Sequence, residues 1–170
     1  GYQPGGDGYV NAPYIDMSIP YAAGSLYSTV EDLYRWDQAL YTNKLLGPEL
    51  MRKMFTPGLG NYGYGWGIRQ VPVGPDKANR TVTAHGGGIN GFSSLIRRVV
   101  EDRHMVVMLD NSSGEHARLD ALSDGILDIL YGRTPPAPKP PIVGELERVL
   151  REGGIDKALA RFREIKSGQP

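Results

Sequence analysis

Residues 92–100 and 103–109 form two strand-like runs with only the dipeptide Glu-Asp between them, and this feature most constrains the fold. Two runs rich in apolar and β-branched residues, joined by so short a connection, predict an antiparallel hairpin. In the second run, the segment MVVML from Met105 to Leu109 is apolar without alternation. We therefore expect that strand to be covered on both faces.

Further strands are expected before this hairpin. Residues 62–71 combine aromatic and β-branched side chains with glycine at every second position from Gly63 to Gly67. This spacing leaves one face of the strand open to another backbone or to a ligand. Residues 80–84 form a short strand-like run that leads into a run of glycines. This run and residues 92–100 count either as one sheet strand or as two separate strands. The sequence thus predicts three sheet strands, or four if these two are separate.

The first predicted helix begins near Ser28. A capping box forms there, either from Ser28 with Glu31 or from Thr29 with Asp32. Apolar residues follow at helical spacing, with one aspartate among them, and predict that this helix continues to about Tyr41.

Two more helices are expected in the main part of the chain. Pro48 opens a short one, which Pro57 and the following glycine end. The other runs from about Glu115 to Tyr131. The residues expected to face the core from this last helix are Leu119, Leu122, Ile126, Ile129 and Leu130.

The two ends of the chain differ from its middle. Residues 1–25 are rich in glycine, proline and tyrosine without a clear period, which predicts ordered loop or extended chain. Residues 133–141 form a proline-rich, extended linker. The tail, 142–170, carries two short amphipathic helices separated by a Gly-Gly pair. We therefore expect a domain over 1–132, a linker and a helical tail.

Composition narrows the classes of function. The 170 residues carry 19 basic and 19 acidic side chains, which gives no electrostatic reason to expect nucleic acid as a partner. There is no cysteine, so disulfides, thiolate metal sites and cysteine nucleophiles are excluded. No apolar run approaches the length of a membrane span. The chain starts Gly-Tyr-Gln, without methionine or a signal peptide, as we expect from the middle of a longer protein.

The string AHGGGINGFSS, residues 84–94, points to serine hydrolase chemistry of one of two kinds. In lipases of the α/β-hydrolase type, HGGG supplies N–H groups to an oxyanion hole, but those enzymes also need a G-x-S-x-G elbow. The nearest match here, GFSSL from Gly91, ends in leucine. In β-lactamases and penicillin-binding proteins, a Lys-Thr-Gly or His-x-Gly triplet lines the site, and the nucleophile lies in S-x-x-K. None of the six lysines has serine three residues before it, so this chain contains no S-x-x-K.

The residue order resembles the serine β-lactamase-like family. The string PYAAGSLYSTVEDLYRWDQAL, residues 20–40, is similar to the A-G-G-L-x-S-T-x-x-D-L segment of that family, which includes class C β-lactamases, penicillin-binding proteins, D-aminopeptidases and related esterases. The strings LLGPELMRKMFTP, YGYGWGI, HGGGINGFSS and VVMLDNSSG then follow in the matching order. The resemblance covers about residues 1–131 and only the C-terminal half of the family's domain. It implies an α+β fold, with an antiparallel sheet flanked by helices.

The resemblance also implies roles for single residues. His85, Gly86 and Gly87 correspond to the triplet on the active-site strand, with histidine in place of the usual lysine. Gly86 stands where threonine or serine often stands, which puts β-lactam turnover in doubt. Gly88 directs its backbone N–H at the developing oxyanion, and His85 polarises the site or assists proton transfer. The residues expected beside the substrate are Tyr62, Tyr64, Trp66 and Asn90.

Other candidate residues have simpler interpretations. His104 is expected as an exposed residue at a strand end. His116 and Asp120 are four apart on a helix, but a solvated helix start explains them better than a metal, and no metal or cofactor is predicted. Ser93 and Ser94 are expected as strand residues, because no base stands at a fixed spacing from them.

Two functions follow from these observations. The first is a segment of a serine hydrolase that forms an acyl-enzyme on an ester, amide, β-lactam or D-amino-acid peptide, with the nucleophile, its lysine and a tyrosine motif upstream of Gly1. The second is a non-catalytic interaction module of the same family, with the tail docking a partner. The upstream half of the polypeptide is the expected partner of the first. An unpaired sheet edge and an uncovered apolar face are expected to favour self-association of the isolated segment. The resemblance implies a periplasmic, cell-envelope or secreted location.

Overall fold

A computed structural model describes residues 1–5, 8–74, 76–137 and 142–167. The chain divides into two compact units, Gly1–Pro135 and Pro136–Pro170. Part of the proline-rich segment, residues 138–141, lies outside the described residues.

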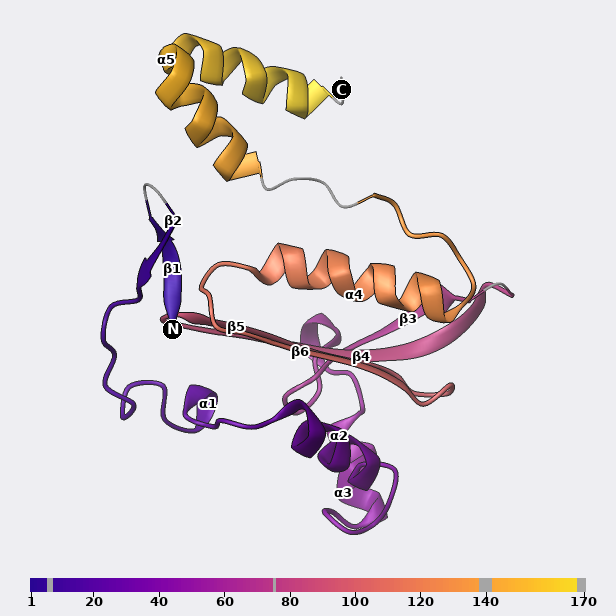
Figure 1. The fold of residues 1–170 in the computed structure, drawn as a ribbon. Coiled ribbons are helices and arrows are strands. Elements are labelled where there is room, and N and C mark those ends of the chain that lie inside the picture. Colours follow the sequence, from indigo (N-terminus) through magenta and orange to yellow (C-terminus); the bar gives the residue numbers. More distant parts are fainter. Residues whose placement is uncertain (6–7, 75, 138–141, 168–170) are drawn as a thin grey trace. The chain divides into compact units, whose positions relative to one another are not determined.

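The first unit is built on a four-stranded antiparallel sheet. Its strands are β3 (Gly67–Val73), β4 (Ala78–Ile89), β5 (Phe92–Val99) and β6 (His104–Asp110), in the order β3-β4-β5-β6. Each neighbouring pair is antiparallel. The helix α4 (His116–Leu130) lies on one face, and α2 (Val30–Ala39) and α3 (Pro48–Met54) lie on the other (Figure 1). This confirms the α+β fold with an antiparallel sheet flanked by helices.

Two strands differ from the sequence-based expectation. β3 begins at Gly67 rather than Tyr62, and the residues before it form a loop that includes the short 3-10 helix Leu59–Asn61. β4 does not stop at Ala84 but continues through the glycines to Ile89. The reason is that β5 pairs with β4 as far as Ile89. The hydrogen bonds of this pairing are made by backbone groups, so glycine residues can take part in it. β4 and β5 are therefore two separate strands.

The N-terminal residues contain a second, small sheet that sequence reasoning missed. β1 (Tyr2–Gly5) and β2 (Gly8–Asn11) pair antiparallel, and a short helix α1 (Tyr21–Gly24) follows. The N–H of Tyr2 donates to the carbonyl of Asn111 at 2.9 Å, and Tyr2 forms a parallel bridge with Ser112. These partners are more than a hundred residues away, so no local pattern announces them.

The helix starts follow local rules. Thr29 is the N-cap of α2, and its hydroxyl accepts the N–H of Asp32 at 3.1 Å, which decides between the two capping alternatives. Pro48 occupies the first turn of α3, where its missing N–H costs nothing.

Two clusters of buried side chains form the core of the first unit, one on each face of the sheet. Leu40, Trp66 and Ile68 form the first, on the face of α2 and α3. Val99, Val106 and Leu127 form the second, beneath α4.

The apolar face expected for α4 is only partly correct. Leu119 is 4% exposed and contacts the sheet side, whereas Leu122 is 42% exposed and Ile129 63% exposed. Ile126 and Leu130 are exposed too. The helix packs on the sheet along the row formed by residues 119, 123 and 127. The other apolar residues point away from this row, so they stay outside the contact.

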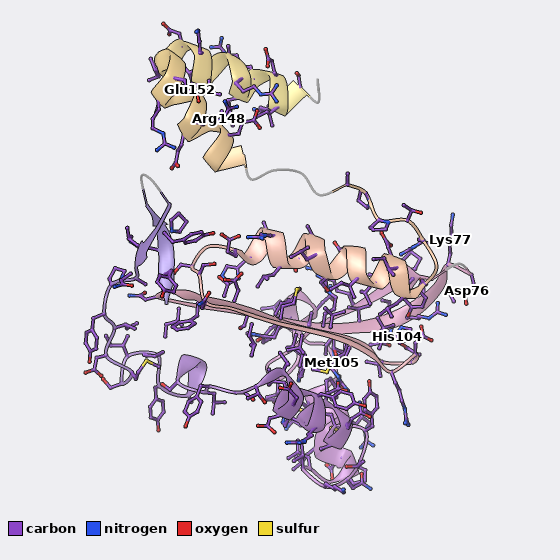
Figure 2. All side chains as sticks on the ribbon, viewed as in Figure 1. Asp76, Lys77, His104, Met105, Arg148 and Glu152 are labelled. Atoms are coloured by element: carbon purple, nitrogen blue, oxygen red, sulfur yellow. The ribbon has the colours of Figure 1, made fainter. Side chains whose placement is uncertain are left out.

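The second unit contains α5 (Ile142–Ser167). Its helical path breaks at Gly154, where φ is 76° and ψ is 179°, so it consists of two helical segments. Arg161 pairs with Glu145 across the break at 2.6 Å, and Arg148 pairs with Glu152 at 3.1 Å within the first segment (Figure 2). Among the described residues, no helix combines the length and the apolar character that crossing a bilayer would require.

Candidate functional site

The glycine-rich end of β4 has a free edge. β3 pairs with β4 only as far as Ala84, which lies opposite Gly67. On its other side, β4 pairs with β5 as far as Ile89. Among the described residues, no strand pairs with β4 beyond Ala84 on the β3 side. The edge from His85 to Ile89 is therefore open to another segment or to a ligand.

The ladder geometry shows which backbone groups point toward this open edge. The N–H of Val100 donates to the carbonyl of Thr81, so Thr81 directs its backbone groups toward β5. In an antiparallel ladder this direction alternates along the strand. His85 and Gly87 consequently face β5, whereas Gly86 and Gly88 turn their N–H and C=O groups toward the open edge.

Side chains alternate between the two faces of β4 in the same way. His85 lies opposite Ile96 and therefore projects on the face of α2 and α3. Gly88 belongs to the α4 face, where a Cβ atom would come within 2.5 Å of the Nε2 atom of His116. A side chain at position 88 would therefore make the exposed His116 ring turn aside. Sequence reasoning missed this contact, because a single histidine at a helix start carries no local signal.

His85 is held by Tyr62. Its Nε2 atom lies 2.7 Å from the Tyr62 hydroxyl, and the two rings meet edge to face with centroids 6.0 Å apart. Tyr62 is 46% exposed, so its ring has surface available beside His85, and Tyr64 is 66% exposed. The Lys53 ammonium lies 5.8 Å from the centre of the Tyr64 ring.

Trp66 lies in a different environment from these two tyrosines. It is 3% exposed and stacks on Trp36, with ring centroids 5.7 Å apart and an interplanar angle of 12°. Phe55 covers another side of the ring. Trp66 therefore belongs to the core rather than to a substrate surface, and it anchors the loop that carries Tyr62.

Asn90 closes the turn between β4 and β5. Its side-chain amide donates to the carbonyl of Pro13 at 3.1 Å, so it ties the N-terminal segment to this end of the sheet. The next residue, Gly91, has φ of 81°, which completes the two-residue turn at little steric cost.

The two serines of β5 are engaged within the sheet. Ser93 is 1% exposed, and its hydroxyl donates to the carbonyl of Ser112 at 2.8 Å. The hydroxyl of Ser94 lies 3.5 Å from the carbonyl of Gly87. Within the described residues, the hydrogen bonds of these hydroxyls involve no histidine or lysine, which fits their interpretation as strand residues.

A buried ion pair lies on the same face as His85. Arg98 is 2% exposed and pairs with Asp37 of α2, which is 0% exposed. Three aromatic rings surround the guanidinium, at 4.8, 5.2 and 5.5 Å from its carbon: Tyr41, Phe55 and Trp66. The signal that could have identified this pair is the aspartate within the apolar spacing of α2. The pair fixes α2 to the sheet beside the candidate site.

The far end of the sheet holds a second polar cluster, away from the glycines. His104, which Figure 2 labels at this end of the sheet, is half-buried rather than exposed. Its ring centroid lies 5.2 Å from that of Tyr131. Burial and the hydrogen bond to Asp102 raise the pKa of Tyr131 to about 12. The same hydrogen bond, followed by the charge of Arg80, lowers the pKa of Asp102. The expectation for His104 was wrong because α4 ends over this strand.

The α4 face of the sheet carries a groove of about 1000 Å³. It runs along β3 and β4, which α4 leaves uncovered. Its lining includes Gly86, Gly88 and His116, together with apolar residues such as Val82 and Leu119. Asp120 forms an ion pair with Arg97 at 2.9 Å. No group of three or more potential metal ligands occurs among the residues that the structure describes.

The fold and the edge together define an α+β protein whose antiparallel sheet presents a glycine-rich strand end between helices. The model of the Beta-lactamase family matches residues 1–131, which is most of the chain. The chain therefore belongs to the Beta-lactamase family.

Several curated proteins resemble part of the chain. It is 28% identical over 124 residues to Penicillin-binding protein 4* of Bacillus subtilis (strain 168), covering 69% of this chain and 26% of that protein. It is 32% identical over 119 residues to Putative penicillin-binding protein PbpX of the same organism, covering 69% and 28%. Human Serine beta-lactamase-like protein LACTB, mitochondrial, is 29% identical over 119 residues, covering 55% and 22%. The chain thus spans about a quarter of the length of these relatives.

The chain also resembles a solved structure. A penicillin-binding protein from Bacillus halodurans covers 58% of this chain and 30% of its own, with 24% sequence identity and a TM-score of 0.48.

Proposed function

We propose that this chain supplies the active-site strand of a serine hydrolase that acts through an acyl-enzyme. The supporting observation is the open edge of β4, where Gly86 and Gly88 direct backbone groups outward beside His85. Fixed N–H donors at such an edge stabilise the negative charge that develops on the carbonyl oxygen during acyl transfer. One donor of this kind contributes about 3 kcal/mol in the transition state.

The nucleophile comes from outside these 170 residues in this proposal. The chain contains no S-x-x-K, and Ser93 and Ser94 are engaged within the sheet. The upstream half of the polypeptide would supply the serine and its lysine, and it would cover the groove beside α4. The substrate is an ester, an amide, a β-lactam or a D-amino-acid peptide. Without a hydroxyl at Gly86, the β-lactam is the substrate that this site supports least.

We further propose a location at the cell envelope. The support comes from two relatives named as penicillin-binding proteins.

The proposal is tested by the intact mass of the chain after incubation with a fluorophosphonate probe, and separately by hydrolysis of a nitrophenyl ester. We expect no adduct and no hydrolysis with these 170 residues, and a single adduct at an upstream serine when the natural reading frame is extended to include S-x-x-K. A stoichiometric adduct on Ser93 or Ser94 of the short chain would mean that the catalytic serine had been misplaced.

The second candidate is a non-catalytic interaction module. It is favoured by the second unit, which lies beyond the family match at residue 131 and exposes apolar side chains. Ile155 is 66% exposed and Phe162 is 46% exposed. An upstream reading frame without S-x-x-K, or an extended chain that forms no adduct, would favour this candidate.

A further inference from the structure

Tyr62 has a fixed backbone although it lies in a loop. Its carbonyl accepts the N–H of Gly58 at 3.0 Å, and the residue forms an isolated bridge with Gly67. The next residue, Gly63, is wedged so closely that a Cβ atom would lie 2.4 Å from the carbonyl oxygen of Met54. The buried ring of Trp66 holds the far end of the loop. The Tyr62 hydroxyl is therefore delivered to His85 by a clamped segment.

The hydrogen bond between Tyr62 and His85 determines which nitrogen of the imidazole carries the proton. A neutral imidazole has one donor nitrogen and one acceptor nitrogen, and the bond made at one nitrogen fixes the role of the other. The phenol O–H is the more acidic donor and the imidazole nitrogen is the more basic acceptor. The two atoms lie 2.7 Å apart, and this difference in acidity favours donation from the Tyr62 hydroxyl to Nε2, which leaves the proton of the neutral ring on Nδ1.

We propose that Tyr62 is a positioning residue that holds His85 as its Nδ1–H tautomer, so that His85 meets a bound molecule as a hydrogen-bond donor and not as a general base. With Nε2 engaged by Tyr62, Nδ1 is the ring nitrogen left for that molecule. Its N–H then adds to the outward backbone groups of Gly86 and Gly88. Such a set of donors suits a carbonyl or carboxylate oxygen. The catalytic meaning of this arrangement rests on the proposed function, whereas the tautomer itself does not.

The test is the tautomer of His85 in the full chain labelled with ¹⁵N-histidine, read from long-range ¹H–¹⁵N correlations at alkaline pH. The chain has three histidines, and His85→Gln identifies the signal of His85 by its loss. We expect the Nδ1–H pattern in the wild-type chain and its loss in Tyr62→Phe, which keeps the ring but removes the donor. Tyr64→Phe is the matched control and should leave the pattern unchanged, because Tyr64 contacts Lys53 rather than His85.

Two results would overturn the proposal: an Nε2–H pattern in the wild-type chain, or an Nδ1–H pattern that persists in Tyr62→Phe. The signals of His104 and His116 report whether each variant retains its fold. Should Tyr62→Phe lose the fold, incorporation of 3-fluorotyrosine replaces it, because a more acidic phenol must shift the Nε2 resonance of His85, and an unmoved resonance refutes the idea. No turnover is needed, so a chain that forms no acyl adduct still passes or fails this test.

Discussion

Replacing Asp37 with alanine leaves the guanidinium of Arg98 buried without its carboxylate. Arg98 is 2% exposed, so the guanidinium stays shielded from bulk solvent when its partner is lost. Removing one member of a buried ion pair costs about 3–5 kcal/mol, because an uncompensated charge stays behind. Each of three rings still offers the guanidinium a cation–π contact of about 0.5–2 kcal/mol: Tyr41, Phe55 and Trp66. We therefore expect a loss at the lower end of the range, about 3 kcal/mol.

The double variant Asp37→Leu with Arg98→Met separates the charge from the packing. It removes both ions together and leaves apolar side chains of similar reach in their place. Such exchanges are often neutral or stabilising, by about 1–4 kcal/mol. The double variant should thus be at least as stable as the wild-type chain, whereas each single variant is destabilised. Arg35→Ala is the surface control, because it breaks an exposed pair with Asp32 on the same helix and should change stability little.

The assay is urea denaturation followed by intrinsic fluorescence. The chain has two tryptophans, and both lie in this cluster, with Trp36 stacked on Trp66. The signal therefore reports the region that the variants perturb. A loss below about 1 kcal/mol for Asp37→Ala would equal that of a surface pair and would refute the reasoning from burial.

Three further outcomes are expected. Gly88→Ala places a methyl group 2.5 Å from the Nε2 atom of His116, but that ring is exposed and can turn to another rotamer, so urea denaturation should show a cost of at most about 1 kcal/mol, which adding His116→Ala should remove. Thr29→Ala removes the cap of α2 and should cost about 1 kcal/mol in the same assay. Because the folded state raises the pKa of Tyr131 to about 12, its stabilisation is complete below the ordinary tyrosine pKa of about 10 and is lost as the pH rises through 12. Denaturation across this window should show a smaller decline for Tyr131→Phe than for wild type, and equal declines would contradict the shift.

The elements that the sequence predicted correctly are those with local causes. The hairpin of β5 and β6 follows from two strand-like runs with a short connection. α2 begins at Val30 because the Thr29 hydroxyl caps the N–H of Asp32, and α3 begins at Pro48 because proline fits the first turn.

The elements that it missed depend on distant partners. β1 is held by Asn111 and Ser112, and β4 continues through three glycines because β5 lies beside it. Neither pairing leaves a periodic pattern in the strand itself. The apolar residues of α4 were assigned to one face, but only the row that touches the sheet is buried, and the sequence does not specify where the sheet lies.

For the candidate site, the letters of the sequence alone were enough to single out His85 and the three glycines, and to show that no S-x-x-K accompanies them. Three features of the site were visible only in the tertiary structure: the edge beyond Ala84 is open, Tyr62 engages Nε2 of His85, and His116 lies against Gly88. The physical reason is the separation in sequence between the residues that interact. A motif and a helix cap are written in neighbouring residues, whereas a strand edge and a hydrogen bond across 23 positions exist only when the folded backbone brings those segments together.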